Sequence, residues 1–147
     1  MRKSVIVLIG IIYVLSIFVV SFLGLEIAPF EEVVYVEKIE ILNEVDGDSC
    51  KVSSEKRVCV KEDHTNHEKY FVVKFDSFAE ATVVTLDWRV YPDNATNSNV
   101  NLIYDEENTN FTIIGNTIAF TGKCTTQVSI YSTDGSGKKA VVTFYVI

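Results

Sequence analysis

Two histidines close together are the residues of this chain best suited to chemistry. His64 and His67 lie in the run KEDHTNHEK, where Asp63 and Glu68 add two carboxylates. Imidazole and carboxylate groups together bind zinc, so His64 and His67 are candidate metal ligands. Their spacing matches no established zinc motif, however, and a stretch so rich in polar residues is typical of a solvated loop. We favour the loop interpretation and keep a metal site as the alternative.

The cysteines suggest a disulfide. Cys50 and Cys59 flank the segment KVSSEKRV, and a two-residue turn at Ser54-Glu55 places them opposite each other on adjacent strands. At such a non-hydrogen-bonded position the Cα atoms approach closely, which suits disulfide geometry. The sequence therefore predicts a Cys50–Cys59 disulfide, with two free thiols as the alternative. Cys124 is left over, either as a small buried apolar side chain or as a free thiol.

No arrangement of catalytic residues stands out in the sequence. Both histidines fall in one expected loop, which leaves no clear general base beside a nucleophile. The acidic run at residues 104–110 lacks the alternating oxygen ligands and central glycine of a calcium loop. Asn94 and Asn110 each begin an N-x-[ST] sequon, but Asn94 lies in VYPDNATNSNV, where Pro92 indicates a turn. We therefore expect neither an enzyme nor a bound cofactor, and a metal-dependent enzyme is the weakest alternative.

The N-terminal region has the composition of a membrane-spanning helix. From Ser4 to Leu25 the chain carries no charged residue. At a rise of about 1.5 Å per residue, a helix of this length crosses a hydrocarbon core about 30 Å thick. A cleaved signal peptide is the alternative, but its apolar region is usually about 7–15 residues long, and Gly24 offers only a poor cleavage site. We predict an uncleaved signal anchor over residues 1–25 and a short linker over residues 26–32.

Charge indicates the orientation of this single-pass anchor in the cell membrane. Arg2 and Lys3 precede the apolar run, and acidic residues follow it. Basic residues beside a span tend to stay in the cytoplasm, so the N-terminus is predicted to be cytoplasmic and the C-terminal domain extracellular. Without Arg2 and Lys3, 11 basic residues remain against 20 acidic ones, a net charge of −9. Such a charge argues against a nucleic-acid partner.

Residues 33–147 have the pattern of an all-β domain. Short runs rich in Val, Ile, Thr, Tyr and Phe are separated by clusters of Asn, Asp, Gly and Ser. In the run at residues 81–91, Val84, Leu86, Trp88 and Val90 alternate with polar residues. One face of a single strand is therefore expected to be buried there.

The expected strands are short and closely spaced, which favours a two-sheet sandwich. In the first strand the apolar phase shifts between Val36 and Ile39, which indicates a bulge or a change of sheet. Before the last strand, Asp134-Gly135 and Gly137 can supply the positive φ values of a hairpin loop. Phe144 is expected in the core. Strands are predicted at residues 33–42, 49–61 as a hairpin, 69–75, 81–91, 99–104, 117–121, 126–132 and 139–147.

The order of motifs in the C-terminal half is distinctive. WRVYPDNATN is followed by SNVNLIY, then IIGNTIAFTG, and finally TTQVSIYSTDGSGKKAVVTFYV. This order resembles the bacterial immunoglobulin-like domains of group 2, found in surface proteins of the intimin and invasin type. In that family a strand runs into a Pro-x-x-Ala-Thr-Asn turn, and the last hairpin carries a Gly-Ser-Gly loop. The matching residues are Pro92, Ala95, Thr96, Asn97, Asp134, Gly135, Ser136 and Gly137.

The resemblance covers about residues 33–43 and 70–147, so residues 44–69, with both paired cysteines, look like an inserted hairpin or loop. It implies an immunoglobulin-like β-sandwich, here preceded by one N-terminal transmembrane helix. Such domains act as binding, adhesion or spacer modules, which implies a protein or glycan partner at the cell envelope. An accessory subunit of a membrane complex for transport, secretion or division is the alternative.

Overall fold

The computed structural model describes residues 3–24, 31–77 and 80–147. The chain divides into two compact units, Met1–Glu32 and Val33–Ile147. Most of the predicted linker at residues 26–32 and the end of the predicted anchor lie outside the described residues.

The first unit contains one helix, α1 (Lys3–Gly24). Its segment Lys3–Phe22 has a mean hydropathy of 3.0, and none of it is buried. The hydroxyl of Ser16 donates a hydrogen bond to the carbonyl of Ile12, at 2.9 Å, so this polar group is satisfied within the helix. The helix is therefore long and apolar enough to cross a membrane, a property that signal sequences share.

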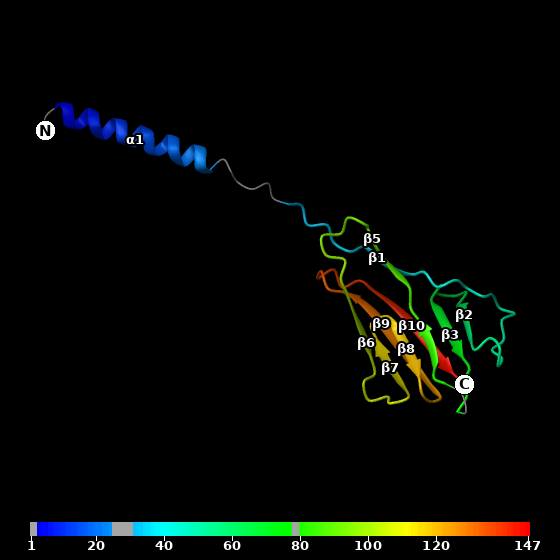
Figure 1. Cartoon of the computed structure of the whole chain (residues 1–147). Coiled ribbons are helices and arrows are strands. Elements are labelled where there is room, and N and C mark those ends of the chain that lie inside the picture. Colours follow the sequence, from blue (N-terminus) through cyan, green and yellow to red (C-terminus); the bar gives the residue numbers. More distant parts are fainter. Residues whose placement is uncertain (1–2, 25–30, 78–79) are drawn as a thin grey trace. The chain divides into compact units, whose positions relative to one another are not determined.

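The second unit is built from strands, which confirms the prediction of a β-rich domain after one apolar helix (Figure 1). Its described residues form a five-stranded sheet in the order β2-β3-β10-β9-β6, a three-stranded sheet β4-β8-β7 and the pair β1-β5. β3 and β10 run parallel, and the other pairs are antiparallel. The strands are β1 (Lys38–Ile41), β2 (Val58–Glu62), β3 (Lys69–Val73), β4 (Thr82–Thr85), β5 (Trp88–Tyr91), β6 (Val100–Tyr104), β7 (Phe111–Ile114), β8 (Thr117–Phe120), β9 (Cys124–Ser132) and β10 (Lys139–Val146).

The single strand predicted at residues 81–91 is wrong, because the chain changes sheet in its middle. β4 pairs with β8, whereas β5 pairs with β1. At the break, the N–H of Leu86 donates to the carbonyl of Asn116, and the N–H of Leu42 donates to the carbonyl of Asp87, each at 2.8 Å. The predicted alternation survives the break, since Leu86 is fully buried and Trp88 is half-buried.

The hairpin predicted at residues 49–61 is also wrong. Only Val58–Glu62 forms a strand, and it pairs with β3 through the loop at residues 63–68. At the predicted turn of Ser54-Glu55, the N–H of Ser53 does donate a hydrogen bond to the carbonyl of Lys56, at 2.8 Å. The short strand β7 was not predicted, although Gly115, with a φ of 63°, provides its tight turn into β8.

The first predicted strand is shorter than expected and begins only at Lys38. Both Val36 and Ile39 are buried, as the predicted shift in phase requires. Before β1, two backbone N–H groups donate hydrogen bonds to side chains. The N–H of Val36 donates to the carboxylate of Asp134, and the N–H of Val34 donates to the hydroxyl of Thr96.

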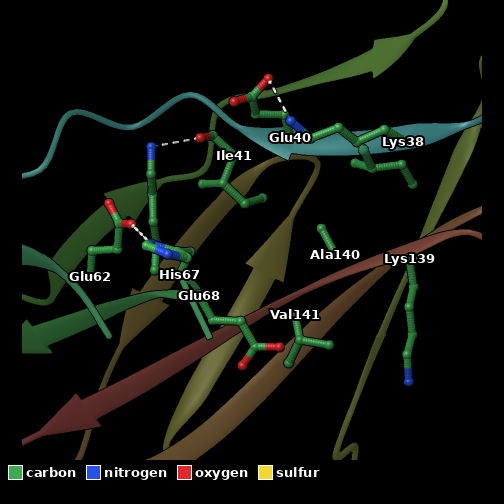
Figure 2. Close-up of a pocket in the computed structure, with 11 residues that line it drawn as sticks. Lys38, Glu40, Ile41, Glu62, His67, Glu68, Lys139, Ala140 and Val141 are labelled. Atoms are coloured by element: carbon green, nitrogen blue, oxygen red, sulfur yellow. Dashed lines mark hydrogen bonds and ion pairs between the residues drawn. The ribbon is translucent and has the colours of Figure 1, made fainter. Parts of the chain in front are cut away.

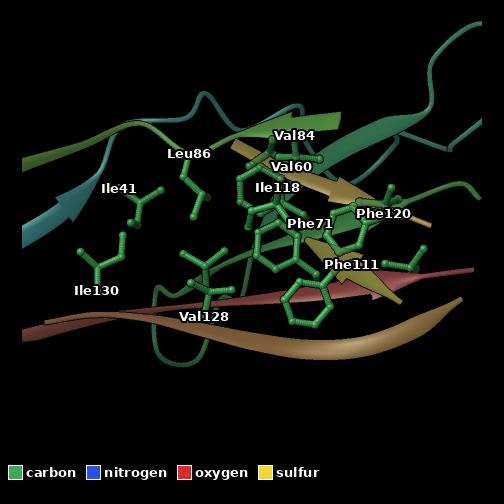
Figure 3. Packing of buried hydrophobic residues seen from close by; sticks show 14 of the residues in the cluster. Ile41, Val60, Phe71, Val84, Leu86, Phe111, Ile118, Phe120, Val128 and Ile130 are labelled. Carbon is green, nitrogen blue, oxygen red and sulfur yellow. The ribbon is translucent and has the colours of Figure 1, made fainter. Parts of the chain in front are cut away.

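The core lies between the five-stranded sheet and the strands of the other two sheets. Figure 3 shows Val84, Leu86 and Ile118 on one side of the core and Val128 and Ile130 on the other. Phe71, Phe120 and Phe144 are fully buried between the layers, with the ring of Phe144 centred 4.9 Å from that of Phe71 and 5.3 Å from that of Phe120. Phe144 is therefore in the core, as predicted.

Candidate functional site

The two histidines lie in the β2–β3 loop, where both side chains are exposed. His64 Nε2 lies 3.3 Å from Asp48 Oδ2, and His67 Nδ1 lies 2.7 Å from Glu62 Oε1. His67 adopts a left-handed backbone with a φ of 57°. Each histidine thus has a different carboxylate partner.

A metal site would need at least three ligand atoms close together. Within the described residues, the His, Cys and carboxylate side chains that meet this condition, within 4.8 Å of one another, are Asp46, Cys50 and Cys59. His64 and His67 are outside this set. The two sulfur atoms in it are at disulfide distance from each other, so they are not free thiolates.

A cavity of about 450 Å³ lies beside His67, between β1, the start of β3 and the start of β10 (Figure 2). Its charged groups have partners: Lys69 Nζ donates to the carbonyls of Ile41 and Asn43, and Lys38 pairs with Glu40 at 3.4 Å. Two of the cavity's ammonium groups are thus held within the chain, Lys38 by a carboxylate and Lys69 by backbone carbonyls.

A second cavity, of about 550 Å³, is lined by acidic and aromatic side chains together with His64 and Thr65. Asp48, Glu62 and Asp63 supply the carboxylates, and Tyr70 and Tyr145 pack edge to face with ring centroids 5.7 Å apart. The sequence did not indicate this site, because Asp48 precedes β2 whereas Tyr145 lies near the end of the chain. Only the alignment of β2, β3 and β10 brings them together.

The structure brings the sulfur atoms of Cys50 and Cys59 to disulfide distance, with Cα atoms 6.0 Å apart. The surrounding loop is held by Asp46, which accepts hydrogen bonds from the ammonium of Lys56 and the N–H of Val60. These bonds, first that from Lys56 and then that from Val60, hold the pKa of Asp46 below its ordinary value. Residues 44–57 are therefore pinned to β2 without forming a strand of their own.

Cys124 is free and half-buried at the start of β9. Partial burial raises the pKa of its thiol, against an opposing hydrogen bond from Asn108. Asn94, which begins the first sequon, is exposed in the turn after β5, and the acidic run near residue 105 forms exposed turns. None of these residues lines either of the two cavities.

Asp134 is a residue whose role the sequence did not reveal. Its carboxylate accepts hydrogen bonds from the N–H of Ser136, at 2.9 Å, and from the N–H of Val36, 98 positions away. Partial burial opposes ionisation, but the bonds from Val36, Ser136 and Ser132 prevail and hold the pKa of Asp134 well below its usual range. The loop around it has positive φ at Gly135 and Gly137, as predicted. Through Asp134 this loop holds the segment that precedes β1.

Comparison of the chain with protein-family models, with curated proteins and with solved structures gave no match. The function must therefore be inferred from the molecule itself: an exposed apolar helix, an acidic β-rich unit, and two cavities lined by charged side chains.

Proposed function

We propose that this chain is a single-pass membrane protein whose immunoglobulin-like domain faces outward and acts as a binding or spacer module at the cell envelope. The observation that carries the proposal is the helix α1, whose apolar side chains are exposed over Lys3–Phe22. Exposed apolar surface of this extent is stable in a bilayer and not in water. Arg2 and Lys3, at the N-terminal end of the apolar segment, favour an outward C-terminal domain.

The strand order supports the immunoglobulin-like assignment. In such domains one sheet has the strand order A-B-E-D and the other contains C, F and G. Here β1 pairs with β5, and β4, which the chain joins to β5, continues the order to β8 and β7. The opposite sheet contains β6, β9 and β10 as neighbours, the order expected for C, F and G.

A binding or spacer role fits the site better than catalysis does. Both histidines are engaged with carboxylates in an exposed loop, and Lys69 in the first cavity is bound to backbone carbonyls. By contrast, the outward surface of β4-β8-β7 is uncharged, with Val83, Thr85 and Ile114 exposed, and such a surface suits contact with another macromolecule.

Thiol labelling of the full chain in intact cells tests the orientation. In a Cys124→Ser background, Thr85→Cys adds an exposed thiol to the β-rich unit, and Ser4→Cys adds one at the start of α1 while leaving Arg2 and Lys3 unchanged. A membrane-impermeant maleimide should label the Thr85→Cys chain in intact cells, and the Ser4→Cys chain only after permeabilisation.

Carbonate extraction and intact mass test the anchor. We expect the chain to stay in the membrane pellet at alkaline pH with its N-terminal segment present. A mature chain that starts after α1 and is released from the membrane would contradict the proposal, because it would identify α1 as a cleaved signal sequence.

A further inference from the structure

Strand β6 forms one edge of the five-stranded sheet (Figure 1). Within the described residues its one neighbour in the sheet is β9. The N–H of Thr133 donates to the carbonyl of Asn99, at 3.0 Å, so every second residue of β6 counted from Asn99 directs its backbone groups toward β9. The N–H and C=O groups of Val100, Leu102 and Tyr104 therefore point away from the sheet, and none of them bonds to another described residue.

The opposite edge of the same sheet, at β2, is covered. The N–H of Val60 donates to the carboxylate of Asp46, and the carbonyl of Val60 accepts from the N–H of Asp46, each at 2.8 Å. The ammonium of Lys61 bonds to the carbonyl of Asp48, at 3.3 Å. Proteins cover or charge their sheet edges because an open edge pairs with other chains. β6, with the sequence VNLIY, has no such cover and contains neither a charged residue nor a proline.

The core is open to one side of β6. A third cavity, of about 470 Å³, is lined by Leu86, Asp87, Trp88, Val100, Leu102, Gly115 and Asn116. Leu86 is fully buried, whereas Trp88, Val100 and Leu102 pack against the core and are only partly buried. Residues opposite each other on paired strands point to the same side of a sheet. A strand added beside β6 would thus direct every second side chain toward this apolar space.

The end of β6 is acidic. Three exposed carboxylates follow its last residue, in the run Asp105-Glu106-Glu107, and none of them forms an ion pair with another described residue. Lys123 follows a residue whose N–H bonds to the far end of this loop, so three acidic groups face one basic group here. Arg89, on β5, is already paired with Asp93, at 2.6 Å.

The start of β6 has the opposite balance. Val100 lies opposite Ser132, whose N–H donates to the carbonyl of Lys138, at 2.9 Å. Lys138 and Lys139 therefore belong to this end, where the carboxylate of Asp134 is bound to backbone N–H groups. A basic residue of an added strand is favoured beside the acidic run, and not beside these two lysines.

We propose that the edge of β6 binds an extended segment of a partner polypeptide by strand addition. The segment pairs antiparallel to β6 through the free backbone groups of Val100, Leu102 and Tyr104. It directs apolar side chains into the third cavity at alternate positions and carries a basic residue beside the acidic run. In this mode of recognition the backbone bonds provide affinity, and pockets for alternate side chains provide specificity. The proposal rests on the binding role proposed above and names the chemistry of the partner.

Amide hydrogen exchange of the isotope-labelled full chain in detergent micelles reports on this edge. The N–H groups of Val100, Leu102 and Tyr104, defined as the edge amides, should exchange fast. Those of Asn101 and Ile103, which bond to β9, should exchange slowly. Slow exchange of the edge amides in the chain alone would contradict an open edge. Protection that rises with protein concentration would identify a second copy as the occupant and would also overturn the proposal.

A strand attached to the same chain provides a probe at high local concentration. The probe is Lys-Val-Thr-Leu-Thr-Val, joined to Ile147 by a Gly-Ser linker of about 15 residues, which spans roughly 20 Å. The linker reaches β6 because β10 is separated from it by one strand. At a millimolar effective concentration, exchange of the edge amides should slow at least about tenfold. The N–H groups of Phe111 and Ile113, which face away from β8 on the neighbouring edge strand β7, should be unaffected.

Two matched probes test how the strand is held. Lys-Pro-Thr-Pro-Thr-Pro keeps the lysine but lacks the N–H groups that must donate to β6, so it should give no protection. Glu-Val-Thr-Leu-Thr-Val should protect clearly less than the lysine probe, and Glu106→Lys with Glu107→Lys should restore its effect. Glu55→Lys, at an exposed position in the segment that precedes β2, is the charge control and should change neither probe.

Each part of the proposal can fail. Unchanged exchange of the edge amides with the lysine probe would exclude strand addition to β6, and protection of Phe111 and Ile113 instead would place the strand on β7. Equal protection by the lysine and glutamate probes would exclude a basic partner. Thermal unfolding confirms that each variant is folded. These results leave the labelling and extraction tests of anchoring unaffected, so the two proposals can fail separately.

Discussion

At the scale of single residues, the carboxylate of Asp134 connects the last hairpin to the beginning of the domain. It accepts hydrogen bonds from Ser136 within its own loop and from Val36, which lies just before β1. Asp and Asn commonly bond to backbone N–H groups nearby in turns. Here the same side chain also makes a contact of long sequence separation, so one carboxylate closes the loop and fixes the N-terminal segment.

Replacement of Asp134 should destabilise the domain in a pH-dependent way. Its pKa is depressed in the folded chain, so its stabilising contribution is complete above the unfolded-state value of about 3.9 and declines as the pH falls below it. Asp134→Asn should therefore lower the Tm at neutral pH, and the difference from the original chain should narrow below about pH 4. Asp87→Asn, at an exposed position, is the control. A difference that stays constant from pH 7 to pH 2.5 would contradict the assignment.

Removal of the Cys50–Cys59 link should cost measurable stability. The two residues are 9 positions apart, and closing a loop of that size contributes about 2–3 kcal/mol. Cys50→Ser should therefore lower the free energy of unfolding in urea by about this amount, whereas Cys124→Ser should change it little. Thiol titration gives the complementary check: three reactive thiols in the denatured, unreduced chain would show that the link is not formed.

At the scale of elements, hydrogen bonds from two asparagines shape the change of sheet between β4 and β5. The side chain of Asn43 accepts from the N–H of Asp87 and donates to the carbonyl of Thr85, each at 2.9 Å. The side chain of Asn116 donates to the carbonyl of Leu86, at 3.0 Å. The backbone groups released by the break are thereby satisfied, which allows one continuous run of sequence to serve two sheets.

In the parallel pair of β3 and β10, Phe71 and Phe144 lie opposite each other and their rings are buried between the layers. Phe144 is fully buried against Phe71 and Phe120. Phe144→Ala should lower the free energy of unfolding by about 3–5 kcal/mol, because it leaves a cavity in the core. The next residue provides a matched control, since Tyr145→Ala removes a side chain that is 43% exposed and should cost clearly less. Chemical denaturation of the two variants compares them directly, and equal losses would argue against this packing.

At the scale of the whole molecule, the proposed orientation depends on the basic residues that precede the apolar run of α1. Changing Arg2 and Lys3 together to glutamate should strongly reduce labelling of the Thr85→Cys chain from outside the cell, because basic residues direct the N-terminus to the cytoplasm. Changing Glu31 and Glu32 to glutamine should have little effect, since acidic residues contribute little to orientation. Unchanged labelling in the first variant would refute the role of these charges.

Several features could be predicted because they depend on neighbouring residues. The apolar run of α1 has the length of a membrane span, and the alternation at Val84, Leu86 and Trp88 indicates a strand with one buried face. The glycines at positions 135 and 137 indicate a hairpin loop, since positive φ costs glycine little. Each of these signals comes from residues that are close together in the sequence, so it does not depend on how the rest of the chain folds.

Only the tertiary structure decided which of these elements meet. The partner of β2 is β3 and not the segment around Cys50, the run at residues 81–91 divides between two sheets, and His64 and His67 turn to different carboxylates. The acidic cavity joins Asp48 to Tyr145 in the same way. Strand pairing is a long-range choice, made by hydrogen bonding and core burial over the whole domain, and alternation along one strand carries no information about its neighbour.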